Sequence, residues 1–161
     1  MNFLDVERDY IRRRILPDFE WTAFDLPTEP NPLSKPLKDC KVALVATSGA
    51  YLREKQEPFS TKSKLGDDSF RIIPNETAPE AIGLAHPGYD TKRALLDLDC
   101  VFPCLLLNRL KDEGVIGEVA PRHFSFMGYV PKPEGLIWRT SPQVGRQLLQ
   151  DQVDLVILVP S

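Results

Sequence analysis

Two uninterrupted apolar runs dominate the hydrophobic pattern of the chain. They are "KVALVAT" (residues 41–47) and "VDLVILVP" (residues 153–160), and they carry few polar residues over the length of a strand. A strand that is apolar on both faces is typical of a parallel sheet covered on both sides. The shorter runs "SFRIIP" (residues 69–74) and "EAIGLAH" (residues 80–86) predict two further strands.

Helical patterns separate these strands. Residues 3–16 carry apolar side chains at helical spacing, which predicts an amphipathic N-terminal helix. Three more helices are expected, over residues 90–98 with Asp90 or Thr91 as a cap, over 103–114, and over 141–152 with Ser141 as a cap. The alternation predicts an α/β fold, a Rossmann-like three-layer arrangement of a mostly parallel sheet and crossover helices, with the N-terminal helix appended.

Two segments lack a clear period. The stretch "LPTEPNPLSKP" (residues 26–36) contains four prolines and predicts a stiff connector. It divides residues 1–37, the first helix and connector, from an α/β domain over residues 38–161. The stretch "APRHFSFMGY" (residues 120–129) is aromatic and is expected to be irregular, either a lid over a small ligand or a turn that covers the core.

Composition and charge exclude several classes of protein. A net charge of −3 argues against nucleic-acid binding, because the only basic cluster, residues 12–14, lies among acidic residues. No apolar run approaches the roughly 20 residues of a membrane helix, and residues 1–10 do not resemble a signal peptide. We therefore expect a cytoplasmic protein without a membrane partner. Three cysteines fit a reducing compartment without a disulfide framework.

Polar side chains next to the predicted strands are the candidates for chemistry. Thr47, Ser48 and Gly49 follow the first strand, where backbone amides can hold an anion, although a tight turn explains them equally well. Arg71 can hold a carboxylate in a bidentate contact, or the surrounding residues can form a turn. His86 and His123 are candidate proton donors, and each can equally be a structural histidine.

The cysteines and carboxylates do not predict a metal-binding or catalytic site. Cys100 and Cys104 lack metal-site or redox spacing and are expected to be buried and inert, and Cys40 is expected to be structural. No set of residues has the spacing of a metal site or a catalytic triad. The residues thus predict an incomplete site at the strand ends, without an evident nucleophile.

The segments "KVALVATSGAYL", "GDDSFRIIP", "HPGYDT", "GVIGEVAPRHFSFMGY" and "VDLVILVPS" together resemble one family over residues 38–161. It is the selenoprotein B family of glycine, sarcosine and betaine reductase and of D-proline reductase, and the length resembles the shorter, D-proline-reductase type. The resemblance implies a reductase that cleaves a carbon–nitrogen bond. It also implies a selenol or thiol nucleophile, a pyruvoyl-containing partner subunit and a dithiol or thioredoxin-like electron donor.

In this family the selenocysteine or cysteine directly follows the strand that matches "VDLVILVPS". We therefore expect the nucleophile just after Ser161, encoded by UGA if it is selenocysteine, and none of the three cysteines matches it. Thr47, Ser48 and Gly49 are then expected to bind the substrate carboxylate, and His86 or His123 to protonate the departing amine. The alternatives are a non-catalytic module that binds a small carboxylate or docks to a partner, and a lyase or racemase with two opposed histidines.

Overall fold

The main sheet is built around β1, Lys41–Ala46, whose apolar side chains are buried on both faces. The computed structural model describes residues 2–24, 28–29 and 31–161. β1 pairs in parallel with β7, Leu155–Val159, from Val42 opposite Leu155 to Ala46 opposite Val159. It also pairs in parallel with β5, Glu118–Val119, near its start and with β6, Arg122–Ser125, near its end. The predicted α/β class and the mostly parallel sheet are confirmed.

The remaining strands are antiparallel. β3, Arg71–Pro74, pairs with β6 and completes the main sheet. β2, Ala50–Leu52, and β4, Ile82–Leu84, form a separate two-stranded sheet. The strands expected over residues 69–74 and 80–86 are therefore present, but the second belongs to this small sheet, which the sequence pattern did not predict.

The prediction of an irregular loop over residues 120–129 is wrong, because part of this segment forms β6. His123, Phe124, Ser125 and Phe126 are all buried, so the segment does not alternate between polar and apolar residues as a half-exposed strand does. Two polar side chains are accommodated because each accepts a backbone hydrogen bond. His123 Nδ1 accepts from Leu44 N, and Ser125 Oγ accepts from Ala50 N.

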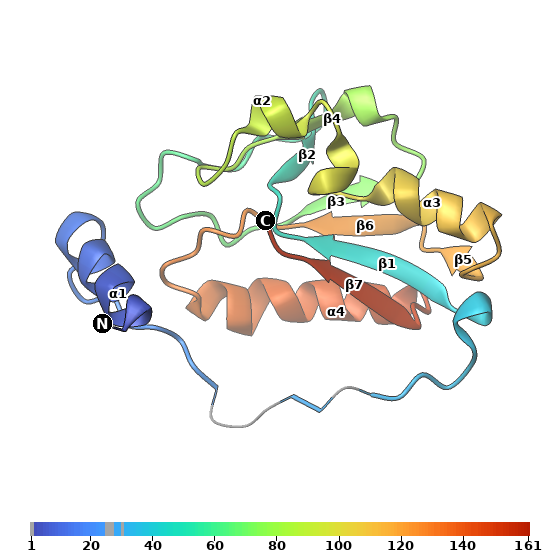
Figure 1. Cartoon of the computed structure of the whole chain (residues 1–161), viewed down its shortest axis with the longest axis horizontal. Coiled ribbons are helices and arrows are strands. Elements are labelled where there is room, and N and C mark those ends of the chain that lie inside the picture. Colours follow the sequence, from blue (N-terminus) through green and yellow to red (C-terminus); the bar gives the residue numbers. More distant parts are fainter. Residues whose placement is uncertain (1, 25–27, 30) are drawn as a thin grey trace.

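Two helices cover opposite faces of the main sheet (Figure 1). α3, Cys104–Asp112, packs on the core that contains Leu44, Phe102 and Leu107. α4, Ser141–Gln150, packs through Val144 on Phe124 and Phe126. The expected cap at Ser141 is wrong, since helical backbone already begins upstream in a π-helical turn, Leu136–Thr140.

The predicted helix over residues 90–98 is a single turn, α2, Thr91–Ala94. Of the two expected caps, Asp90 is confirmed, because its side chain accepts from the amides of Lys92 and Arg93, and Thr91 is the first helical residue. Short 3-10 turns lie at Leu37–Asp39, Pro79–Ala81 and Leu98–Cys100.

The N-terminal helix, α1, Phe3–Arg14, lies beside the sheet domain and has no buried residue (Figure 1). The segment after it folds back, and the Arg12 guanidinium donates to the carbonyl of Phe19. The expected connector over residues 26–36 lies partly outside the described residues, and residues 31–33 form neither helix nor strand. Among the residues that the structure describes, no helix has the length and apolar character needed to cross a membrane.

Candidate functional site

The ends of β1 and β7 meet at one edge of the main sheet. Thr47 N donates to the carbonyl of Val159 at 3.0 Å, and Ser161 N donates to Thr47 Oγ1 at 2.9 Å. Residues just beyond the carboxyl ends of parallel strands form the usual binding crevice of such sheets. Ser161 is therefore held directly against the turn that follows β1.

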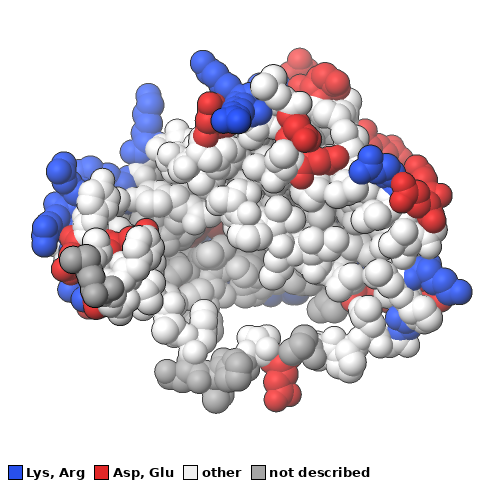
Figure 2. Space-filling view, in the orientation of Figure 1, with Lys and Arg blue, Asp and Glu red and all other residues white. Residues whose placement is uncertain are grey.

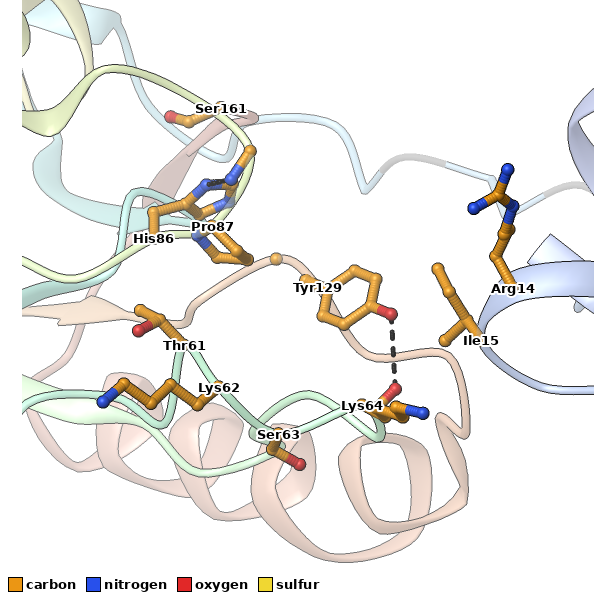
Figure 3. A pocket seen from close by; sticks show the side chains of 12 residues that line it. Arg14, Ile15, Thr61, Lys62, Ser63, Lys64, His86, Pro87, Tyr129 and Ser161 are labelled. Atoms are coloured by element: carbon orange, nitrogen blue, oxygen red, sulfur yellow. Dashed lines mark hydrogen bonds between the residues drawn. The ribbon is translucent and has the colours of Figure 1, made fainter. Parts of the chain in front are cut away.

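A cavity of about 540 Å³ opens beside Ser161. This volume is within the range of small-molecule sites. Figure 3 shows its walls, which come from the end of α1, the loop before β3, the segment after β4 and the segment after β6. The lining residues are Arg14, Ile15, Thr61, Lys62, Ser63, Lys64, His86, Pro87, Gly88, Gly128, Tyr129 and Ser161.

The charged lining of this cavity is cationic. Arg14, Lys62 and Lys64 line it, and none of the described lining residues is acidic. Figure 2 shows Lys and Arg side chains at the end of the molecule where α1 lies, with Asp and Glu side chains of the same region among them. Since the net charge of the chain is −3, this local excess of positive charge is a property of the site, and it favours a small anion.

The turn after β1 is closed by hydrogen bonds that engage the amides of Thr47 and Gly49. Gly49 N donates to the carbonyl of Phe126 at 2.7 Å, and Gly49 adopts a φ of +69°. A Cβ at this position would lie 2.2 Å from the carbonyl oxygen of Ala85, so only glycine fits. The amides of Thr47 and Gly49 already donate to backbone carbonyls, so they are not free to bind a carboxylate. The expected carboxylate contact at Thr47, Ser48 and Gly49 stays a prediction.

His86 lies at the cavity and is half-buried. Its Nδ1 accepts a hydrogen bond from Gly88 N at 2.9 Å. Its ring packs against Tyr89 at a centroid distance of 4.7 Å, and the Tyr89 hydroxyl donates to the carbonyl of Ser48 at 2.6 Å. Burial lowers the pKa of His86 below its ordinary value.

His123 does not reach the cavity. It is fully buried, with Nδ1 accepting from Leu44 N at 3.1 Å and Nε2 at 3.0 Å from Asn75 Oδ1. Burial lowers its pKa to about 4. The structure therefore separates the two candidate proton donors, because His86 faces the cavity and His123 completes the hydrogen bonding between β1 and β6.

Arg71 is also engaged away from the cavity. Its guanidinium donates to the carbonyls of Glu57 and Phe70 and to Ser69 Oγ, and it stacks 4.2 Å over the ring of Phe59. Arg71 is not among the lining residues of the cavity beside Ser161. Its carboxylate-binding role stays a prediction that the geometry does not favour.

Neither Cys100 nor Cys104 is an activated thiolate. Cys104 is buried, as expected, and Cys40 is buried as well. Cys100 is exposed, which corrects the expectation that it is buried. The Asp97 carboxylate, hydrogen-bonded to Cys100, raises the pKa of that thiol, and burial raises the pKa of Cys104. In residues 2–24, 28–29 and 31–161, no cluster of His, Cys, Asp or Glu side chains has a metal-binding arrangement.

Sequence reasoning missed the cationic residues of the site. Arg14, Lys62 and Lys64 come from two segments that are far apart in the sequence, and only the fold brings them to one cavity. A partial signal was available in "TKSK" (residues 61–64), which is a cationic loop in a chain of negative net charge.

Comparison with known proteins gives one consistent family. The family model for glycine/sarcosine/betaine reductase selenoprotein B matches residues 17–161. The chain is 35% identical over 127 residues to the D-proline reductase subunit gamma of Acetoanaerobium sticklandii, covering 79% of this chain and 51% of that protein.

Two glycine reductase subunits are also similar. The chain is 31% identical over 135 residues to the glycine reductase complex component B subunit gamma of Symbiobacterium thermophilum, covering 80% of this chain and 30% of that protein. It is 29% identical over 147 residues to the subunit of the same name from Peptoclostridium acidaminophilum, covering 88% and 32%. No solved structure matches.

The chain spans about half, or less, of the length of these curated relatives. The family match nevertheless includes the whole sheet domain, with the cavity residues of the loop before β3 and the segments after β4 and β6. The chain belongs to the glycine/sarcosine/betaine reductase selenoprotein B family, whose members include subunits of reductase complexes.

Proposed function

We propose that this chain forms the substrate-binding part of a selenol- or thiol-dependent reductase subunit. The reaction is cleavage of a carbon–nitrogen bond in an amino acid or amine of the D-proline or glycine/betaine type. One observation carries the proposal: the end of β7 at Ser161 opens into a cationic cavity beside His86. The relatives named as D-proline reductase and glycine reductase subunits support the reaction class.

The proposed chemistry needs a nucleophile at the residue after Ser161. A selenolate or thiolate at this point attacks the carbon that bears the amine, and the carbon–nitrogen electron pair leaves with the amine. A second thiol then attacks the selenium or sulfur, the carbon leaves with that bonding pair and takes up a proton, and a selenenylsulfide or disulfide forms. A dithiol or thioredoxin-like donor supplies two electrons and restores the nucleophile.

The residues of this chain would bind and orient the substrate. Lys62 and Lys64 are exposed cations at the cavity and can attract a carboxylate, and Arg14 closes the cavity from α1. Of the two candidate proton donors only His86 is placed to act on a molecule in the cavity. A pyruvoyl group on a partner subunit would supply electron withdrawal at the substrate amine.

The test is reduction of D-proline by the complete gene product, expressed with its co-encoded subunits and supplied with dithiothreitol. We expect the ring-opened amino acid, and we expect its loss when the residue after Ser161 is replaced by alanine. Glycine, sarcosine and betaine are the parallel substrates. Binding of D-proline without turnover of any of the four would overturn the reductase proposal and favour the alternative of a non-catalytic carboxylate-binding module.

A further inference from the structure

His86 is held by backbone contacts that fix where its ring points. Ala85 N donates to the carbonyl of Gly49 at 2.9 Å, which locks the segment after β4 onto the turn after β1. The ring packs against Tyr89. His86 also lines the cavity, where Figure 3 shows it. The position of the imidazole is thus set by the same turn that holds Ser161.

The hydrogen bond from Gly88 defines the tautomer of His86. A backbone N–H can only donate, so Nδ1 must present its lone pair at 2.9 Å from Gly88 N. In the neutral ring the proton is then on Nε2. A doubly protonated ring would place two N–H groups against each other at Nδ1.

The other ring nitrogen, Nε2, lies beside Gly128 and close to Thr47, and His86 and Gly128 both line the cavity. A Cβ on Gly128 would lie 3.3 Å from His86 Nε2 and 3.0 Å from Thr47 Cβ, so the missing side chain keeps this corner clear. Gly128 lines the cavity, and its φ of +83° favours glycine. No hydrogen-bond partner of His86 Nε2 occurs among the described residues.

No acidic side chain among the described lining residues of the cavity is available to stabilise an imidazolium. Arg14, Lys62 and Lys64 face the same cavity and are cationic. Tyr89, which packs on the ring, is a neutral phenol whose pKa is raised by burial to about 12. The nearby Asp90 carboxylate is turned to the amides of α2.

We propose that His86 acts as a neutral hydrogen-bond donor through Nε2–H toward an anionic group in the cavity, and that Tyr89 is its positioning residue. This inference rests on the proposed function for the identity of the anion, which is either the substrate carboxylate or the selenolate or thiolate after Ser161. It revises the expected role of His86, because a neutral imidazole stabilises negative charge and does not protonate the departing amine.

The first test is independent of catalysis. Residues 1–161 contain two histidines, so long-range 15N–1H spectra of the histidine-labelled complete protein report on both rings, and His86→Gln assigns the signals of His86. We expect the Nε2–H tautomer of His86 at pH 7 and a pKa below 6.5. An Nδ1–H tautomer, or an imidazolium at pH 7, would overturn the proposal.

Variants of Tyr89 test the positioning role in the same spectra. Tyr89→Leu removes the ring contact and is expected to give a mixture of tautomers, whereas Tyr89→Phe keeps the contact and is expected to have a smaller effect. Tyr129→Phe is the matched control, since Tyr129 lines the cavity but donates to Lys64 O. Unchanged His86 signals in Tyr89→Leu would remove Tyr89 from the proposal.

The second test uses the complete, active protein. The side-chain amide of glutamine can place an N–H near the position of His Nε2, so His86→Gln should retain most of the rate. His86→Leu should lose about 10- to 100-fold, as expected for one hydrogen bond to a charged group. A proton donor would lose its function in both variants and would give a rate that falls as pH rises through its pKa.

Two further readouts identify the anion and separate the two proposals. Signals of His86 that shift with D-proline but not with D-prolinamide indicate the substrate carboxylate. Signals that shift when the residue after Ser161 is replaced by alanine indicate the nucleophile. No response to either anion would refute the donor role. If the complete protein is inactive but His86 has the expected tautomer and responds to an anion, only the proposed function is overturned. If the complete protein is active but His86 is an imidazolium, only this inference is overturned.

Discussion

The two histidines make similar local hydrogen bonds but lie in contrasting surroundings. Each Nδ1 accepts a backbone N–H, from Gly88 for His86 and from Leu44 for His123. The second ring nitrogen of His123 meets Asn75 inside the core, and that of His86 faces the cavity. The same ring chemistry is therefore structural at one position and available to a ligand at the other, and burial of the second nitrogen makes the difference.

The largest expected effect is on the stability of the core histidine. His123→Leu leaves Leu44 N–H buried without an acceptor, which is expected to lower the free energy of unfolding by about 2–4 kcal/mol. His86→Leu should cost less than about 1 kcal/mol, because His86 is only half-buried and Gly88 N can bond to water. Urea unfolding of the three proteins measures both. Equal losses would contradict the contrast between the two sites.

A pH dependence of stability should follow from His123. Its pKa is about 4 in the folded protein, against an ordinary value of about 6.5. Below pH 6.5 the unfolded chain binds a proton that the folded chain does not, so this contribution is complete above pH 6.5 and is lost as pH falls toward 4. The loss reaches about 3 kcal/mol.

Denaturant titrations at several pH values can isolate this contribution. The variant His123→Asn can keep an acceptor for Leu44 N–H without the titrating ring, so its stability should vary less between pH 6.5 and 4 than that of the natural chain. Parallel curves for the two proteins would show that His123 does not titrate in this range.

The smallest expected effect concerns the cations around His86. Lys62→Gln and Lys64→Gln should each weaken binding of D-proline by about two- to fivefold, because exposed charge contacts contribute at most about 1 kcal/mol. Lys55→Gln is the matched control, since Lys55 is an exposed lysine outside this cavity. Calorimetric titration at low and high salt measures the effect, which salt should reduce. Equal affinities for all three variants would exclude the lysines as a carboxylate site.

The two apolar strands β1 and β7 also differ in how much of each is buried. β7 pairs with β1 along its whole length, yet Leu158 is 72% exposed, whereas the side chains of β1 are largely buried. Both strands are similarly apolar in sequence. Neighbouring elements, and not the strand's own composition, therefore set how much of each strand is buried.

The sequence alone determined the elements that depend on local pattern. The apolar runs at residues 41–47 and 153–160 predicted two parallel strands, and Asp90 predicted a helix start, because these signals lie within a few consecutive residues. The family could also be identified from short segments. The strand at Arg122–Ser125 was missed because its polar residues are buried through contacts with Leu44 and Ala50, which the local pattern does not contain.

Only the tertiary structure decided the composition of the site. Ser161, His86 and Lys62 lie far apart in the chain and meet because β7 pairs with β1 and the small sheet folds onto the turn after β1. The sequence offered two histidines with equal claims, and burial separated them. The residue type determines which chemistry a histidine can perform. Its pKa, the hydrogen bonding of its second ring nitrogen and its access to a ligand are set by neighbours that the fold brings from distant parts of the chain.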